Sequence, residues 1–185
     1  MGMEIEEGRI RPGTKHRNLI RTWRDLWVPI HTAEQPTPAQ QSPISWDELS
    51  HFIHITPYLR RFIAGRADLV MKIKGAFFEF QQVITPTGKQ SVKEEEVPKE
   101  KPDWADEHRS AVRAICDAIL NNAIYTSDPL SQFHIATDAS ERGLGAVLFQ
   151  LARDIPASTL YTKSLNAKLQ IISFYSFKLT DSEKR

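Results

Sequence analysis

FHIATDAS (residues 133–140) and GLGAVLFQ (residues 143–150) are the two stretches that decide the fold of this chain, which has 185 residues. In the first stretch, bulky residues alternate with small or polar ones, so the two sets face opposite sides of a β-strand. Residues 140–143 (Ser-Glu-Arg-Gly) supply the turn between the stretches, and Gly143 can adopt a positive φ at little cost. The apolar run 146–149 suits a strand that is covered on both faces. The pattern predicts a β-hairpin that carries Asp138 at the end of its first strand.

A third strand is expected over residues 169–177, where most residues are β-branched or aromatic. A polar loop, about residues 153–168, separates it from the hairpin. The remaining regular structure is helical. We expect helices over residues 14–26 and 106–124, the second anchored at its start by Trp104.

A further helix begins at Ser45, because Ser45 followed by Glu48 forms a capping box. Pro57 should kink this helix or break it in two. Residues 34–43 contain two prolines and a glutamine pair and indicate a linker. Residues 81–102 are polar, charged and proline-containing, which predicts a flexible insertion.

Four segments of the chain, in this order, resemble one known family. EEGRIRPGTKHRNLIRTW (6–23), SWDELSHFIHITPYLRRFIAGRADL (45–69), DWADEHRSAVRAICDAILNNAIYTSDP (103–129) and the hairpin with IISFYSFKLTDSEKR (171–185) look like parts of the polyprotein of gypsy-type LTR retroelements. They are similar to the end of the reverse-transcriptase palm, the thumb, the helical connection and the start of the RNase H domain.

The resemblance implies an α+β fold, in which a helical thumb and connection segment precedes an incomplete RNase H-like antiparallel three-stranded sheet. It divides the chain into five parts. They are a palm-to-thumb leader and linker (1–43), a thumb-like helical segment (44–80), a flexible charged insertion (81–102), a connecting helix (103–130) and the N-terminal part of an RNase H-like domain (131–185).

In this family, the position of Asp138 belongs to the first catalytic carboxylate of RNase H, which implies Mg²⁺ as cofactor and Asp138 as a metal ligand. Two-metal cleavage needs carboxylates from several elements to hold the ions about 4 Å apart. The family's next carboxylates are a glutamate and an aspartate beyond KLTDSEKR, and the sequence stops at Arg185. It also contains no Tyr-x-Asp-Asp motif of a polymerase. Both active sites are therefore expected to be incomplete.

Read without the resemblance, Asp138 is a strand-end residue that hydrogen-bonds the following turn. The nearby acids Glu141, Asp154 and Glu183 are expected in the turn, the loop and the start of the next helix. None of these positions matches the family's later carboxylates.

The net charge of +1 hides a local asymmetry. Six basic residues and no acid lie between Arg9 and Arg24, whereas acids dominate residues 93–107. Basic residues beside aromatic ones suit a nucleic-acid backbone, and the alternative is a solvated basic face. The thumb of the family grips the template–primer duplex, which favours binding of duplex or RNA–DNA hybrid. The residues expected to contact phosphates are Arg60, Arg61, Arg66 and Lys72.

Three functions remain open from the sequence. The first is an inactive fragment of a retroelement reverse transcriptase and ribonuclease H. The second is a retained nucleic-acid-binding module without catalysis, and the third is a hydrolase in which Asp138 recruits replacement ligands or a partner chain. A single cysteine, Cys116, excludes an internal disulfide and suits a core position in a reducing compartment. No apolar run is long enough to span a membrane, so we expect an intracellular protein, cytoplasmic or nuclear, that is not secreted.

Overall fold

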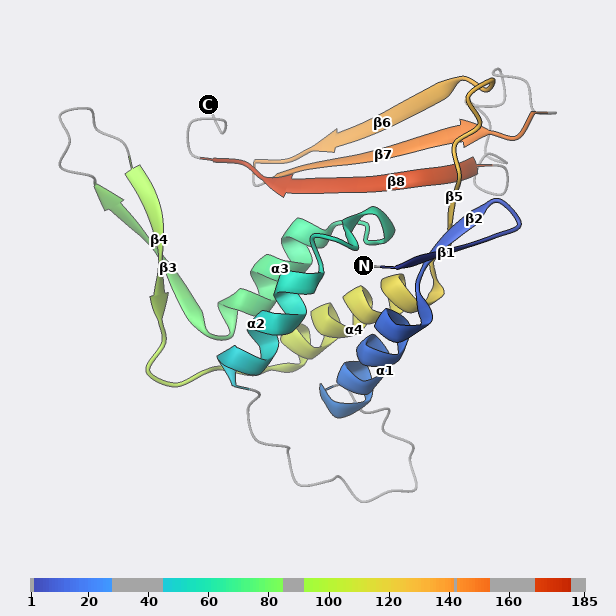
Figure 1. The fold of residues 1–185 in the computed structure, drawn as a ribbon. Helices are drawn as coiled ribbons and strands as arrows, with labels where there is room; N and C mark the ends of the chain where they lie inside the picture. The colour runs from blue at the N-terminus through green and yellow to red at the C-terminus, as the bar shows by residue number, and fades with distance from the viewer. Residues whose placement is uncertain (1, 28–44, 85–91, 142, 154–168, 181–185) are drawn as a thin grey trace.

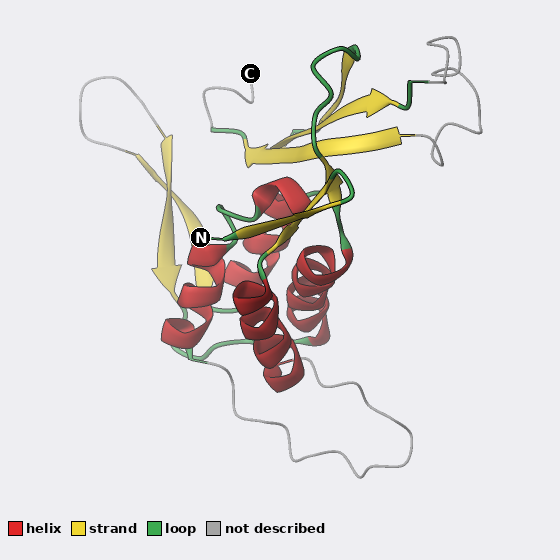
Figure 2. Cartoon of the chain, turned by 45° about the vertical axis from the view of Figure 1, so that its right-hand side comes forward, coloured by secondary structure: helices red, strands yellow, loops and turns green. Residues whose placement is uncertain are grey.

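The computed structural model describes residues 2–27, 45–84, 92–141, 143–153 and 169–180. It has a mixed α+β fold, in which a group of helices lies beneath a three-stranded antiparallel sheet (Figure 1). A smaller three-stranded sheet and a two-stranded hairpin flank the helices (Figure 2). The fold class expected from the sequence is confirmed.

The helices begin and end close to where the sequence places them. They are α1 (Thr14–Trp27), α2 (Trp46–Ile55), the short 3₁₀ helix η1 (Arg60–Phe62), α3 (Arg66–Gly75) and α4 (Asp106–Asn121). Ser45 caps α2, since its Oγ accepts the Glu48 N–H and the Glu48 carboxylate accepts the Ser45 N–H, so the capping box is confirmed. The break predicted near Pro57 is also confirmed, because α2 ends at Ile55 and η1 follows.

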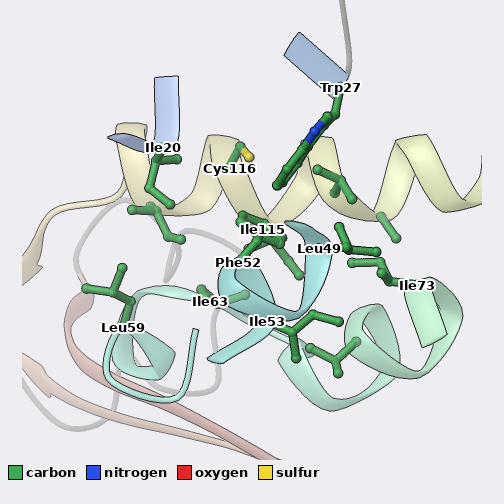
Figure 3. Close-up of a cluster of buried hydrophobic side chains, with 14 of the residues drawn as sticks. Ile20, Trp27, Leu49, Phe52, Ile53, Leu59, Ile63, Ile73, Ile115 and Cys116 are labelled. Atoms are coloured by element: carbon green, nitrogen blue, oxygen red, sulfur yellow. The ribbon is translucent and has the colours of Figure 1, made fainter. Parts of the chain in front are cut away.

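The four α-helices share one hydrophobic core (Figure 3). Trp23 and Trp27 of α1 stack with their ring centroids 5.6 Å apart, and both meet the Phe52 ring edge-on. The fully buried side chains come from every helix and from the η1 turn, and include Ile20, Leu49, Phe52, Leu59, Phe62, Ile63, Ile73, Val112, Ile115, Cys116 and Ile119. Full burial of one such side chain contributes about 1.5–3 kcal/mol. The placement of Cys116 in the core is confirmed.

A small sheet joins the N-terminal hairpin to the end of α4. Its strands are β1 (Met3–Glu6), β2 (Arg9–Pro12) and β5 (Ile124–Tyr125), in the order β1-β2-β5. The hairpin turn consists of Glu7 and Gly8, both with positive φ, as a two-residue turn of the primed type requires. Arg9 pairs with Tyr125 and Ile10 with Ile124, so residues more than a hundred positions apart become neighbours.

The larger sheet has the order β6-β7-β8, with β6 at Phe133–Ala139, β7 at Gly143–Leu151 and β8 at Leu169–Lys178. All pairs are antiparallel, which confirms the predicted hairpin and third strand. The sheet is anchored through β8, which packs against η1, α3 and β5. The edge strand β6 is largely exposed, and Ile135 keeps 70% of its surface accessible.

Gly143 is needed for a reason other than the one predicted. Its φ is not in the left-handed region, but a Cβ there would lie 2.8 Å from the Phe177 carbonyl oxygen of β8. The close approach of β8 to the start of β7 therefore excludes a side chain at this position.

The segment 81–102, expected as a flexible charged insertion, contains paired strands where the structure describes it. β3 (Phe78–Ile84) and β4 (Val92–Pro98) pair as an antiparallel hairpin that projects from the helices (Figure 1). Lys74 of α3 holds its base through an ion pair of 2.6 Å with Glu96. The linker expected at 34–43 lies outside the described residues. None of the described helices combines the length and apolarity that crossing a bilayer requires.

Candidate nucleic-acid interface

Asp138 lies exposed near the end of β6, opposite Gly145 of β7. The side chain that bonds the following turn belongs to Ser140 instead. The Ser140 Oγ accepts the Gly143 N–H at 3.2 Å, and the Ser140 N–H donates to the Gly143 carbonyl at 2.9 Å. The turn-bonding role that the sequence allowed for Asp138 is therefore performed two residues later, which leaves the Asp138 carboxylate at the surface.

The residues around Asp138 do not fit the Mg²⁺ site that the resemblance implies. Within the described ranges, no group of three or more His, Cys, Asp or Glu side chains could hold a metal ion. Mg²⁺ requires near-octahedral oxygen ligation, and one exposed carboxylate does not provide it. Asp154 and Glu183 lie outside the described residues.

Arg60 and Arg61 are placed by the break after α2. The chain cannot continue the helix through Pro57, so it tightens into η1, where successive side chains diverge around the turn. Arg60 is exposed, and its guanidinium carbon lies 5.6 Å from the centroid of the Tyr175 ring on β8. This is a cation–π distance, so β8 holds Arg60 at the junction of the helices and the larger sheet.

Arg66 occupies a different environment from Arg60. It is half-buried at the start of α3, and its Nε donates to the Thr56 Oγ1 at 2.8 Å. Burial lowers the pKa of Arg66 from its usual value, and the nearby positive charge of Arg60 lowers it further. Arg66 therefore joins the start of α3 to the end of α2 while it adds to the local positive potential.

Lys72 is exposed on α3. Among the described residues, no carboxylate lies within ion-pair distance of Lys72, Arg60 or Arg61. These three cations therefore remain available to an external anion.

A hydrogen bond fixes α3 against the larger sheet. The Ala67 N–H donates to the Ser176 Oγ of β8 at 3.0 Å. Ser176 lies opposite Gly145, which lies opposite Asp138, so the three residues form one row across the sheet. Two strand spacings of about 4.8 Å place Asp138 on the order of 10 Å from Ser176. The hydrogen bond to Ser176 and the strand pairing thus connect the start of α3 to the strand that carries Asp138.

The basic leader is more neutralised than its sequence indicates. The Arg17 Nη2 lies 2.6 Å from the Glu4 Oε2, and the Arg24 Nη1 lies 3.6 Å from the Asp117 Oδ1 of α4. Both acids come from outside the uninterrupted basic stretch, so a local count of charge does not detect them. Tyr175 was likewise not recognised as the partner of Arg60, because no local pattern predicts a contact over that separation.

A family model described as the RNase H-like domain found in reverse transcriptase matches residues 104–161. This segment contains α4, β5, β6 and β7. No curated protein matches the chain.

Solved structures of a foamy viral protease-reverse transcriptase are similar to the chain. One is the form designated dRH in complex with double-stranded DNA, with a TM-score of 0.49 and 13% sequence identity. The similarity covers 99% of this chain and 25% of the viral chain. A second complex with double-stranded DNA gives 0.48 at 13% identity, over 100% and 30%. The complex with an RNA/DNA hybrid gives 0.48 at 12% identity, over 99% and 19%. The chain thus spans less than a third of the length of these proteins.

Proposed function

We propose that this chain is part of a reverse transcriptase and ribonuclease H polyprotein of a gypsy-type LTR retroelement. The match of residues 104–161 to the RNase H-like domain found in reverse transcriptase supports the C-terminal part of this proposal. The thumb-like residues 45–69, which precede that segment, support the rest through their resemblance to the same polyproteins. On this proposal, the parent protein performs RNA-directed DNA synthesis and cleaves the RNA of RNA–DNA hybrids.

Within that protein, we propose that this chain binds an RNA–DNA hybrid or duplex through Arg60, Arg61 and Lys72, with Arg66 positioned behind them. The observation that carries the proposal is that Arg60, Arg61 and Lys72, on the neighbouring elements η1 and α3, have no carboxylate within ion-pair distance among the described residues. By contrast, Arg17 and Arg24 of the leader are each paired with a carboxylate. Unpaired cations gain most from phosphates, because binding displaces condensed counterions without first breaking an internal ion pair.

The proposed binding is not catalytic. Asp138 is the sole carboxylate of the RNase H pattern within the described ranges, and its surroundings do not fit a two-metal site. We therefore expect hybrid binding without hydrolysis by this chain.

The test measures fluorescence anisotropy of a labelled RNA–DNA hybrid against the full chain over a series of salt concentrations. Each phosphate contact contributes about 0.9 to the slope of log K against log salt for a duplex. Replacing both Arg60 and Arg61 by glutamine should weaken binding and lower that slope by about 2. Arg113→Gln is the control, because Arg113 is an exposed arginine on α4, outside the proposed interface.

Equal binding by the double variant and the Arg113 variant would refute the assignment. The absence of catalysis is tested separately with Mg²⁺ and the same hybrid. Cleavage that disappears in Asp138→Asn would show that the chain is an active hydrolase after all.

A further inference from the structure

A cavity of about 300 Å³ lies where β2, β5, the end of α4 and β8 meet. Its wall includes Arg9 and Arg11 of β2, Asn121 of α4, Tyr125 of β5, and Ile171 and Phe174 of β8. None of the described residues that line it carries a carboxylate. Two guanidinium groups beside aromatic and amide groups define a cavity that favours an anion with a flat, partly apolar body.

The two arginines reach the cavity because of strand geometry. Arg9 and Arg11 alternate with Ile10, which packs against the hydrophobic core, so both arginines extend from the opposite face of β2. The Arg9 Nη2 donates to the Tyr125 Oη at 3.2 Å, and its guanidinium carbon lies 5.2 Å from the Tyr125 ring centroid. This contact orients Arg9 while using one of its five N–H donors.

Two acids of the neighbouring strand β1 lie opposite these arginines. Glu4 is opposite Arg11 and Glu6 is opposite Arg9. The Glu4 carboxylate is already engaged, because it accepts hydrogen bonds from Thr14 and pairs with Arg17 at the start of α1. Glu6 is therefore the acid that opposes an incoming anion at the cavity.

The cavity also connects to the interface proposed above. Asn122, which lines the cavity, donates from its Nδ2 to the Phe62 carbonyl of η1 at 2.9 Å. Phe62 directly follows Arg60 and Arg61 in the chain. This hydrogen bond therefore fixes the wall of the cavity to the turn that carries Arg60 and Arg61.

We propose that this cavity binds one nucleotide of a single-stranded segment, with the phosphate on Arg9 and Arg11 and the sugar and base against Tyr125 and Phe174. Small-molecule pockets begin at about 300 Å³, a size that suits one nucleotide. Base stacking on aromatic side chains is tolerant of sequence, so the site should accept any base. The inference rests on the proposed function, since both need a nucleic-acid ligand, but it concerns a separate set of residues.

The experiment titrates the isotope-labelled full chain with adenosine 5′-monophosphate and follows backbone and arginine Nε–H resonances by NMR. Shifts are expected at Arg9, Arg11, Tyr125 and Phe174. Titrations with inorganic phosphate and with adenosine show whether both halves of the nucleotide contribute, and each should bind more weakly than the monophosphate.

Three variants test the assignment, each with its fold verified by circular dichroism. Arg11→Gln should weaken monophosphate binding about tenfold, as expected for loss of a charge-assisted contact. Glu6→Gln should strengthen binding a few-fold because it removes the opposing charge, and Arg113→Gln on α4 should change nothing.

Two outcomes would overturn the inference. The first is that Arg11→Gln leaves the affinity for adenosine 5′-monophosphate unchanged. The second is that inorganic phosphate binds as tightly as the monophosphate does. Failure of the hybrid to bind, with the monophosphate response intact, would refute the proposed function and leave the cavity assignment standing. Hybrid binding that depends on Arg60 and Arg61 without any monophosphate response would do the reverse.

Discussion

Gln150 determines how firmly the turn before β6 is held, and its replacement by alanine tests that role. The side chain is 1% exposed, so its polar atoms depend on protein partners. Its Nε2 donates to the carbonyls of Asp128 and Ser131, both at 2.8 Å, and its Oε1 accepts the Asp128 N–H at 2.9 Å. One side chain thus satisfies three backbone groups of the segment that leads into the strand carrying Asp138.

The size of the effect follows from these three hydrogen bonds. Each contributes about 1 kcal/mol net, so Gln150→Ala should lower the free energy of unfolding by about 3 kcal/mol. With a urea m-value of about 2 kcal/mol/M, the midpoint of unfolding should fall by about 1.5 M.

The assay is urea unfolding followed by far-ultraviolet circular dichroism, with amide hydrogen exchange to locate the change. Exchange should accelerate at Asp128 and along β6 and β7, and α1 should be affected least. Gln170→Ala is the matched control, because Gln170 lies directly opposite Gln150 on β8 and is only partly buried. A midpoint for Gln150→Ala equal to that of the control would refute the reasoning.

Three further predictions concern titration, thiol reactivity and solubility. The hydrogen bond from Arg153, with those from the Leu130 N–H and the Ser131 hydroxyl, lowers the pKa of Asp128 below its usual 3.8. A lowered folded-state pKa gives stability that is present above the unfolded value and lost as the pH falls toward the folded one. The melting temperature of the native chain should therefore decline as the pH falls below about 4. The decline should be smaller in Asp128→Asn, and an equal decline in the two proteins would contradict this prediction. Burial raises the pKa of the Cys116 thiol to about 12, so a disulfide reagent should label it only as fast as the helices unfold; rapid labelling without urea would disprove this. Ile135→Lys should reduce aggregation, measured by light scattering, because the native side chain is 70% exposed on an edge strand. The melting temperature should not change. A marked drop in melting temperature would show instead that Ile135 packs in the native state.

Local chemistry explains which parts of the fold could be predicted. The capping box at Ser45 and the break at Pro57 are set by neighbouring residues, and both are present in the structure. The hairpin of β6 and β7 was equally predictable from the sequence, since alternating residues and a turn specify it within one short stretch. The β3–β4 hairpin was missed because its polar, acidic composition resembles that of a disordered segment.

The candidate sites depend on contacts between distant residues, which the sequence does not display. Tyr125 lies on the two-residue strand β5, which pairs with β2 although the two are more than a hundred positions apart in sequence. This pairing allows Tyr125 to accept a hydrogen bond from Arg9. Tyr175 meets Arg60 in the same way, from β8 to η1. The sequence could identify the cations, but their partners required the fold. The phosphate-contact roles of Arg60, Arg61, Arg66 and Lys72 stay predictions until binding is measured.

The position of α4 has a consequence for dividing the chain into working pieces. The segment that matches the RNase H-like domain begins at residue 104, just before α4. Yet Val112, Ile115 and Ile119 of α4 are buried in the same core as α1, α2 and α3. A recombinant piece cut at the start of the match would carry an uncovered apolar helix, and the remainder would lack one wall of its core. For recombinant expression, the natural unit is the whole helical group together with the larger sheet.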